Sequence, residues 1–180
     1  MNSTQGDVFG WYTIPNPPFI CSLHTREEFG KYVNQQVLPL AQLNGFVESA
    51  YDKVQVMMAL NNYTCMGGWA QFNGKYIWSI TTLSPPLSTA AIAGLGQVKL
   101  HELGHNFGLE HANSLYCTQN GVQVPISSSC NSYEYGDVFS GMGNNSRHFS
   151  NLHMEQLGGL ASNRIHTIGS GISDQVHQST

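Results

Sequence analysis

The chain has 180 residues, of which 41% are hydrophobic and 11% aromatic, enough for one domain with a core and too few for two large domains. Only 10% of the residues are charged, the net charge is −4, and the seven Lys and Arg residues form no cluster, so nucleic acid is a poor partner. No apolar run approaches the roughly 20 residues that span a bilayer. We expect a single, monomeric domain over residues 1–180 without a transmembrane segment.

The cysteines are even in number and include no C-x-x-C pair: Cys21, Cys65, Cys117 and Cys130. Two disulfides are the simplest interpretation, and they indicate an oxidising compartment. Three pairings are open, and we favour Cys117–Cys130, which closes a short loop and leaves Cys21–Cys65. The alternative is four buried free thiols in a cytosolic protein. Because residues 1–7 lack an apolar signal core, the protein is either not exported or begins inside a larger precursor.

Two regular elements are predicted in the first third of the chain. Apolar residues recur at helical spacing over residues 26–43, which predicts one helix. Apolar and polar residues alternate within residues 51–60, where Val54, Val56 and Met58 lie on one face of an extended chain. That pattern predicts a core strand.

A hairpin and a second helix follow. Two β-prone runs, residues 67–72 and 75–80, flank Asn73-Gly74, and Asn-Gly between such runs is the strongest short-range hairpin signal. Small residues over 88–100 then lead into His101, which predicts a helix packed tightly in the core that ends at Gly108.

This helix carries an H-E-x-x-H pattern. His101 and His105 are four residues apart, so they stack on one helix face and can direct two imidazoles at one metal ion. Glu102 cannot point the same way as His101. It is too close in sequence to serve as a third ligand and well placed to hold a water molecule bound to the metal.

A third histidine lies six residues beyond His105. In a continuous helix His111 would be about 9 Å further along the axis, too far for a zinc–nitrogen bond of about 2.0–2.1 Å. The chain must therefore leave the helix and double back. Gly108 stands where the bend is needed, because glycine accepts the left-handed conformation that ends helices. The expected result is a three-histidine site with one open position.

The stretch from His101 to His111 resembles the zinc signature of the metzincin metallopeptidases, H-E-x-x-H-x-x-G-x-x-H. The resemblance implies an α+β catalytic domain, with a twisted mixed sheet and long helices, that is excised from a larger precursor. Residues 1–111 would form an N-terminal subdomain with the zinc helix. Residues 112–180 would form an irregular C-terminal subdomain with a Met-turn and a last helix. It also implies secretion and one catalytic Zn²⁺ ion.

The same resemblance gives the hairpin a role. An extended protein substrate would pair with an edge strand near residues 67–80, whereas the alternative is an ordinary hairpin in the core. Calcium is a further candidate cofactor, but no run of alternating acidic residues supports it.

Residues 135–143 resemble the Met-turn, with Met142 placed 31 residues after His111. The methionine would form an apolar floor under the imidazoles and would not be a ligand. Asp137 would hold the turn by accepting backbone N–H bonds. The alternative is a plain Gly-rich turn with a core methionine. Otherwise residues 112–148 show little periodicity, and we expect irregular structure pinned by one disulfide.

A last helical period covers residues 152–160, with Ser150 or Asn151 as its N-cap. The succession of the zinc stretch, the Met-turn and the helix around His153 resembles the gametolysin-like branch of the metzincins.

One position departs from the clan. Astacins and serralysins have a tyrosine two residues after the Met-turn methionine, where it helps to stabilise the transition state, and this chain has Asn144 there. Tyr133, Tyr135 and His148 are candidates for that role. His148 and Asn144 are also candidates for the wall of a substrate pocket.

The implied reaction is peptide-bond hydrolysis. Zinc would activate a water molecule and polarise the scissile carbonyl, and Glu102 would take the proton and deliver it to the leaving amine. Three alternatives stay open. Another class of zinc peptidase would use Glu134 or Glu155 as its third ligand, a binding or adhesion domain would hold zinc without turnover, and a zinc amidase would act on non-peptide substrates.

Overall fold

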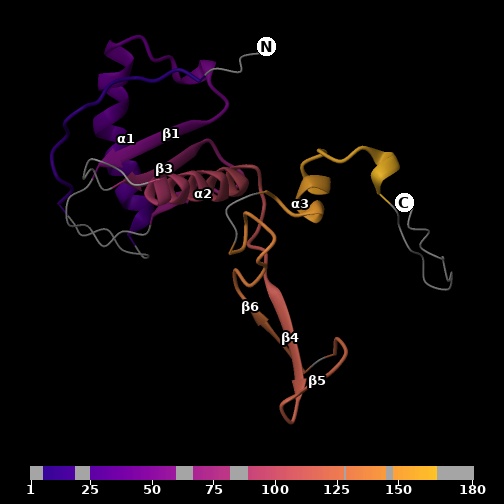
Figure 1. Cartoon of the computed structure of the whole chain (residues 1–180). Coiled ribbons are helices and arrows are strands. Elements are labelled where there is room, and N and C mark those ends of the chain that lie inside the picture. The colour runs from indigo at the N-terminus through magenta and orange to yellow at the C-terminus, as the bar shows by residue number, and fades with distance from the viewer. Residues whose placement is uncertain are drawn as a thin grey trace.

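The computed structural model describes residues 6–18, 25–59, 67–81, 89–127, 129–144 and 148–165. These residues form an α+β structure with a helix-and-sheet body and a separate β-arm (Figure 1). The helices are α1 (Arg26–Leu43), α2 (Thr89–Asn106) and α3 (Asn151–Gln156), with 3-10 turns η1 (Glu48–Ala50) and η2 (Ser162–Arg164). The strands are β1 (Val54–Ala59), β2 (Gly68–Ala70), β3 (Tyr76–Thr81), β4 (Ser114–Gln119), β5 (Val122–Gln123) and β6 (Cys130–Tyr133).

The body contains a small mixed sheet in the order β1-β3-β2. β1 runs parallel to β3, and β2 runs antiparallel to it. Both the helix predicted over residues 26–43 and the strand predicted within 51–60 are confirmed. The packing explains why the sequence showed a helical and an alternating apolar pattern. Alternate side chains of the sheet pack with one face of α1 in a single core. Its buried members are Phe29, Val33, Val56, Met58, Trp69 and Trp78.

Helix α2 lies against the opposite face of this sheet. Ile77, the neighbour of Trp78, points to that face and lines a small cavity together with Leu100 and Leu103 of α2. The close approach of β2 to α2 depends on a glycine. A Cβ atom at Gly68 would lie 2.7 Å from a methyl group of Val98, closer than ordinary contact allows.

The predicted hairpin is confirmed, with β2 and β3 joined by a loop over residues 71–75. This loop is fastened to the end of α2. The Asn73 amide donates to the His105 carbonyl at 2.8 Å, and the buried Asn106 amide group donates to the Gln71 and Tyr76 carbonyls at 2.7 and 3.0 Å. The sheet therefore fixes the helix end that carries His105.

The arm corrects the expectation of irregular structure over residues 112–148. Strands β5, β4 and β6 form an antiparallel sheet that projects away from the body (Figure 1). Asn120 and Gly121 join β4 to β5 with φ of 53° and 78°, the positive values of a tight type I′ turn. The sequence contained this Asn-Gly signal, but the flanking residues are mostly exposed on both faces and so lack an apolar alternation.

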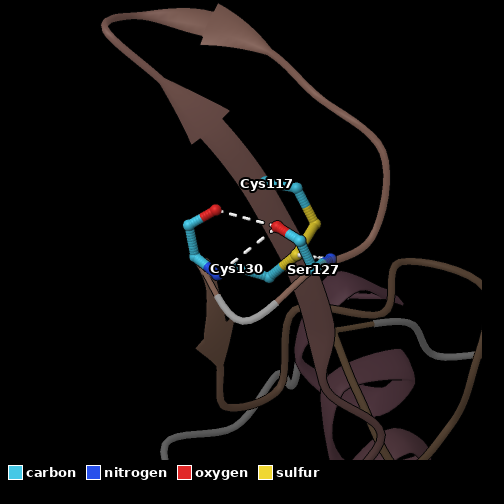
Figure 2. The surroundings of a disulfide bond; sticks show 4 residues. Cys117, Ser127 and Cys130 are labelled. Carbon is cyan, nitrogen blue, oxygen red and sulfur yellow. Dashed lines mark hydrogen bonds between the residues drawn. A yellow bond between two sulfur atoms is a disulfide. The ribbon is translucent and has the colours of Figure 1, made fainter.

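A disulfide between Cys117 and Cys130 links β4 to β6, as expected (Figure 2). The two cysteines are also paired in the strand register. The Cys21–Cys65 pairing lies outside the described residues. Helix α3 begins after Ser150, whose side chain accepts the His153 amide, so Ser150 is the N-cap. None of the helices in the described ranges is both long and apolar enough to cross a bilayer.

Candidate metal centre

The last turn of α2 ends in a Schellman motif. Leu109 N–H bonds the Gly104 carbonyl at 3.0 Å, and Gly108 N–H bonds the His105 carbonyl at 2.9 Å. Gly108 has φ +83°, a conformation that costs a side chain energy and glycine little. The expected bend is therefore present, and it turns the chain back so that His111 approaches the helix.

The three histidines meet at their Nε2 atoms. His105 Nε2 lies 3.1 Å from His101 Nε2 and 3.0 Å from His111 Nε2. Within the described ranges they are the one group of three or more potential ligands close enough to hold a metal ion. The structure thus brings together all three residues that the sequence predicted as ligands.

Each imidazole is oriented by a partner on its other nitrogen. His101 Nδ1 lies 3.0 Å from the Gly141 carbonyl, and His105 Nδ1 lies 2.9 Å from the Leu109 carbonyl. His111 Nδ1 lies 2.6 Å from the Glu134 carboxylate. A carbonyl or an ionised carboxylate only accepts, so each Nδ1 carries a proton, and each ring in its neutral form has a lone pair on Nε2.

In their neutral forms the three rings bring three lone pairs together without a donor between them. Such an arrangement is repulsive unless a cation occupies the point where they meet. Zinc at about 2.0–2.1 Å from each nitrogen would hold them about 3.3–3.4 Å apart in a tetrahedron, slightly wider than the distances here. The donor set and the paired Nδ1 atoms are those of a histidine metal site with its outer partners in place.

Met142 lies directly against the ligand helix and is fully buried. A Cβ atom at Gly104 would overlap its Sδ atom and lie 3.0 Å from Cε1 of Phe149. Glycine at this position, next to His105, therefore makes room for the sulfur. Met142 therefore lies next to the three-histidine cluster, where the resemblance of residues 135–143 to a Met-turn implied that it would be.

Asp137 is in the place expected for a residue that holds this turn. Its carboxylate accepts the Phe139 amide at 2.7 Å, and its carbonyl accepts the Asn144 amide at 2.8 Å. Its own amide donates to the Ala112 carbonyl at 3.1 Å, which ties the turn to the residue after His111.

Glu102 is buried beside the ligands, with 7% of its surface exposed. Burial raises the pKa of its carboxyl to about 7, and the Arg26 guanidinium opposes that shift. The first residue of β2 is close: a Cβ at Gly68 would lie 3.1 Å from Cγ of Glu102. Burial also lowers the pKa of His101 and of His105, which favours their neutral, ligating form.

Two residues, Glu134 and Tyr135, contact His111 in ways that the sequence did not predict. Glu134, weighed as a third ligand, instead holds Nδ1 of His111. The Tyr135 ring packs against the His111 ring at a tilt of 38°, with 4.0 Å between the ring centroids, and its centroid lies 5.6 Å from that of His101. Its φ of +60° is strained for a residue with a side chain. Burial, followed by the Glu134 charge, raises the pKa of the Tyr135 hydroxyl.

The remaining candidates lie outside this cluster. Tyr133 is half exposed on the arm and packs with Tyr116 at 6.3 Å. The His148 side chain is exposed, and only its carbonyl touches the turn, accepting the Gly141 amide at 2.6 Å. Asn144 is also exposed. Comparisons with known proteins add nothing to this geometry: no family model, curated protein or solved structure matches the chain.

Proposed function

We propose that the protein is a zinc-dependent endopeptidase of the metzincin type, with one ion held by His101, His105 and His111. The observation that carries the proposal is the convergence of three Nε2 atoms, on rings whose Nδ1 atoms have their own acceptors, beside the buried Glu102 carboxyl group. A site that only stabilised the fold would need no such carboxylate, since zinc in structural sites is closed by a fourth protein ligand.

In the proposed reaction the ion and the side chains of the protein have separate roles. When bound, zinc supplies a Lewis acid that polarises a carbonyl and makes water a nucleophile near neutral pH. Glu102 accepts the proton of the attacking water and returns it to the leaving amine. The Nδ1 partners hold the three rings in the tautomer that leaves Nε2 free, and Tyr135 shields one face of His111 from solvent.

The substrate would lie along β2. This strand pairs with β3 on one side and has no strand partner on its other side within the described ranges. An extended polypeptide could add there through main-chain hydrogen bonds. Because Gly68 lies next to Glu102, a peptide in that position passes the candidate base. The cross-strand disulfide of the arm agrees with the proposal that the protein acts outside the cell.

The test compares two isosteric variants on a fluorogenic, unfolded casein, with zinc content measured in each. Glu102→Gln should keep the ion and lose roughly 10²–10⁴-fold in rate, as expected for a general base. Glu110→Gln, which removes an exposed charge next to His111, should hydrolyse casein within a few-fold of the parent.

Two results would redirect the proposal. A zinc-loaded parent without activity on casein would favour a binding or adhesion domain, or an amidase if small acyl amides were cleaved. Activity that survives Glu102→Gln would show that Glu102 is not the base.

A further inference from the structure

Behind the candidate ligands lies a second cluster of buried polar groups. Ser140 has none of its surface exposed, and His153 of α3 has 5% exposed. Ser140 Oγ lies 3.2 Å from His153 Nδ1 and accepts the Met142 amide, also at 3.2 Å. Neither side chain reaches the ion site, so the reaction as proposed does not use them directly.

The direction of these bonds follows from donor counting. The Met142 N–H occupies a lone pair of Ser140 Oγ, which leaves the hydroxyl hydrogen free to donate to His153 Nδ1. If His153 donated instead, the hydroxyl hydrogen would be buried without an acceptor, which is costly. The arrangement therefore fixes His153 as the neutral ring whose Nδ1 accepts.

The tripeptide Ser140-Gly141-Met142 contacts each of the three candidate ligands or a residue next to it. The Gly141 carbonyl accepts from His101 Nδ1 at 3.0 Å, and the Met142 carbonyl accepts the amide of Ala112, the residue after His111, at 2.9 Å. The Met142 sulfur packs on Gly104, the residue before His105. A shift of this tripeptide would move all three rings.

We infer that Ser140 and His153 are positioning residues, a buried pair that holds this tripeptide in the conformation that aims the three imidazoles. The inference rests on the proposed metal site and deepens it. It makes α3 a part of the site: the helix cap at Ser150 places His153, His153 orients the Ser140 hydroxyl, and Ser140 fixes the Met142 backbone.

The experiment uses Co²⁺ in place of zinc, because its d–d spectrum reports ligand geometry independently of activity. Ser140→Ala and His153→Leu should weaken Co²⁺ binding about tenfold, at the low end of the loss for outer partners of metal ligands, and should change the spectrum. His153→Asn, whose side-chain oxygen can replace Nδ1 as acceptor, should restore both. Val33→Ala is the control for stability alone, since it opens a cavity in the core formed by α1 and the sheet.

Parent-like affinity and spectra in Ser140→Ala and His153→Leu would overturn the inference, as would the same spectral change in Val33→Ala. If Ser140→Ala does not fold, the comparison of Co²⁺ affinity and spectrum between His153→Leu and His153→Asn still tests the inference. A parent that binds Co²⁺ but never cleaves casein would contradict the peptidase proposal and leave this one standing. A parent that binds no metal would contradict both.

Discussion

The chain before Gly108 and the chain after it contribute to the candidate site in different ways. The first part, with α2 docked on a regular sheet, supplies two candidate ligands and the candidate base through spacing within one helix. The second part supplies the third candidate ligand and, through Gly141 and Glu134, the groups that orient His101 and His111. Helical periodicity thus places two histidines on one side of the candidate metal site. The less regular segments after Gly108 orient the imidazole rings.

The largest expected effect comes from removing the ligand that only the second part provides. His111→Ala should weaken zinc binding by more than the roughly 10–100-fold that loss of an outer partner costs. Equilibrium dialysis against a competing chelator measures this. Glu110→Ala, at the adjacent exposed position, is the control and should bind as the parent does. Equal affinity in His111→Ala would mean that α2 alone holds the ion.

Substitutions of two glycines in α2 test the contact between the chain before Gly108 and the chain after it. Gly104→Ala should destabilise the fold by about 1–3 kcal/mol, because the new methyl group overlaps the Met142 sulfur. Gly96→Ala meets no atom within 4 Å and should stabilise it by about 0.5–1 kcal/mol. Urea unfolding gives both values. If Gly104→Ala stabilised the fold as Gly96→Ala is expected to, Met142 would not pack on the helix as described.

A smaller effect is expected at the carboxylate that orients His111. Glu134→Gln should weaken zinc binding about tenfold, the low end for an outer partner, because this carboxylate is 66% exposed. Glu110→Gln removes the same charge nearby without removing a hydrogen bond to a ligand. Competition with a fluorescent chelator separates the two variants. A common loss of affinity would point to charge and not to the contact with Nδ1.

The smallest expected effect is on the pH dependence of stability without metal. Burial lowers the pKa of His153 below its ordinary value of 6.5, an effect that the Asp137 charge opposes. The unfolded chain therefore takes up this proton first, so the contribution of His153 is present above about pH 6.5 and is lost as the pH falls toward the lower folded pKa. Urea unfolding between pH 5 and 8 should show a shallower decline in His153→Asn. Superimposable profiles would contradict this.

The sequence was enough to predict the elements and site residues whose signals lie within a few neighbouring positions. The spacing of His101 and His105, the glycine at 108 and the alternation in β1 each follow from neighbours a few residues apart, and the structure agrees. The contact between His111 and Glu134, and the pair formed by Ser140 and His153, join residues that no periodicity relates. The arm was missed because its exposed strands lack an apolar face, although Asn120-Gly121 marked its turn.

The central claim is a single ion held by three imidazoles, and X-ray absorption at the zinc edge tests it most directly. The protein, loaded with one equivalent of Zn²⁺, should show three imidazole nitrogens at about 2.0–2.1 Å, and His111→Ala should show two. Sulfur scattering at about 2.3 Å, or an unchanged spectrum in His111→Ala, would contradict the account.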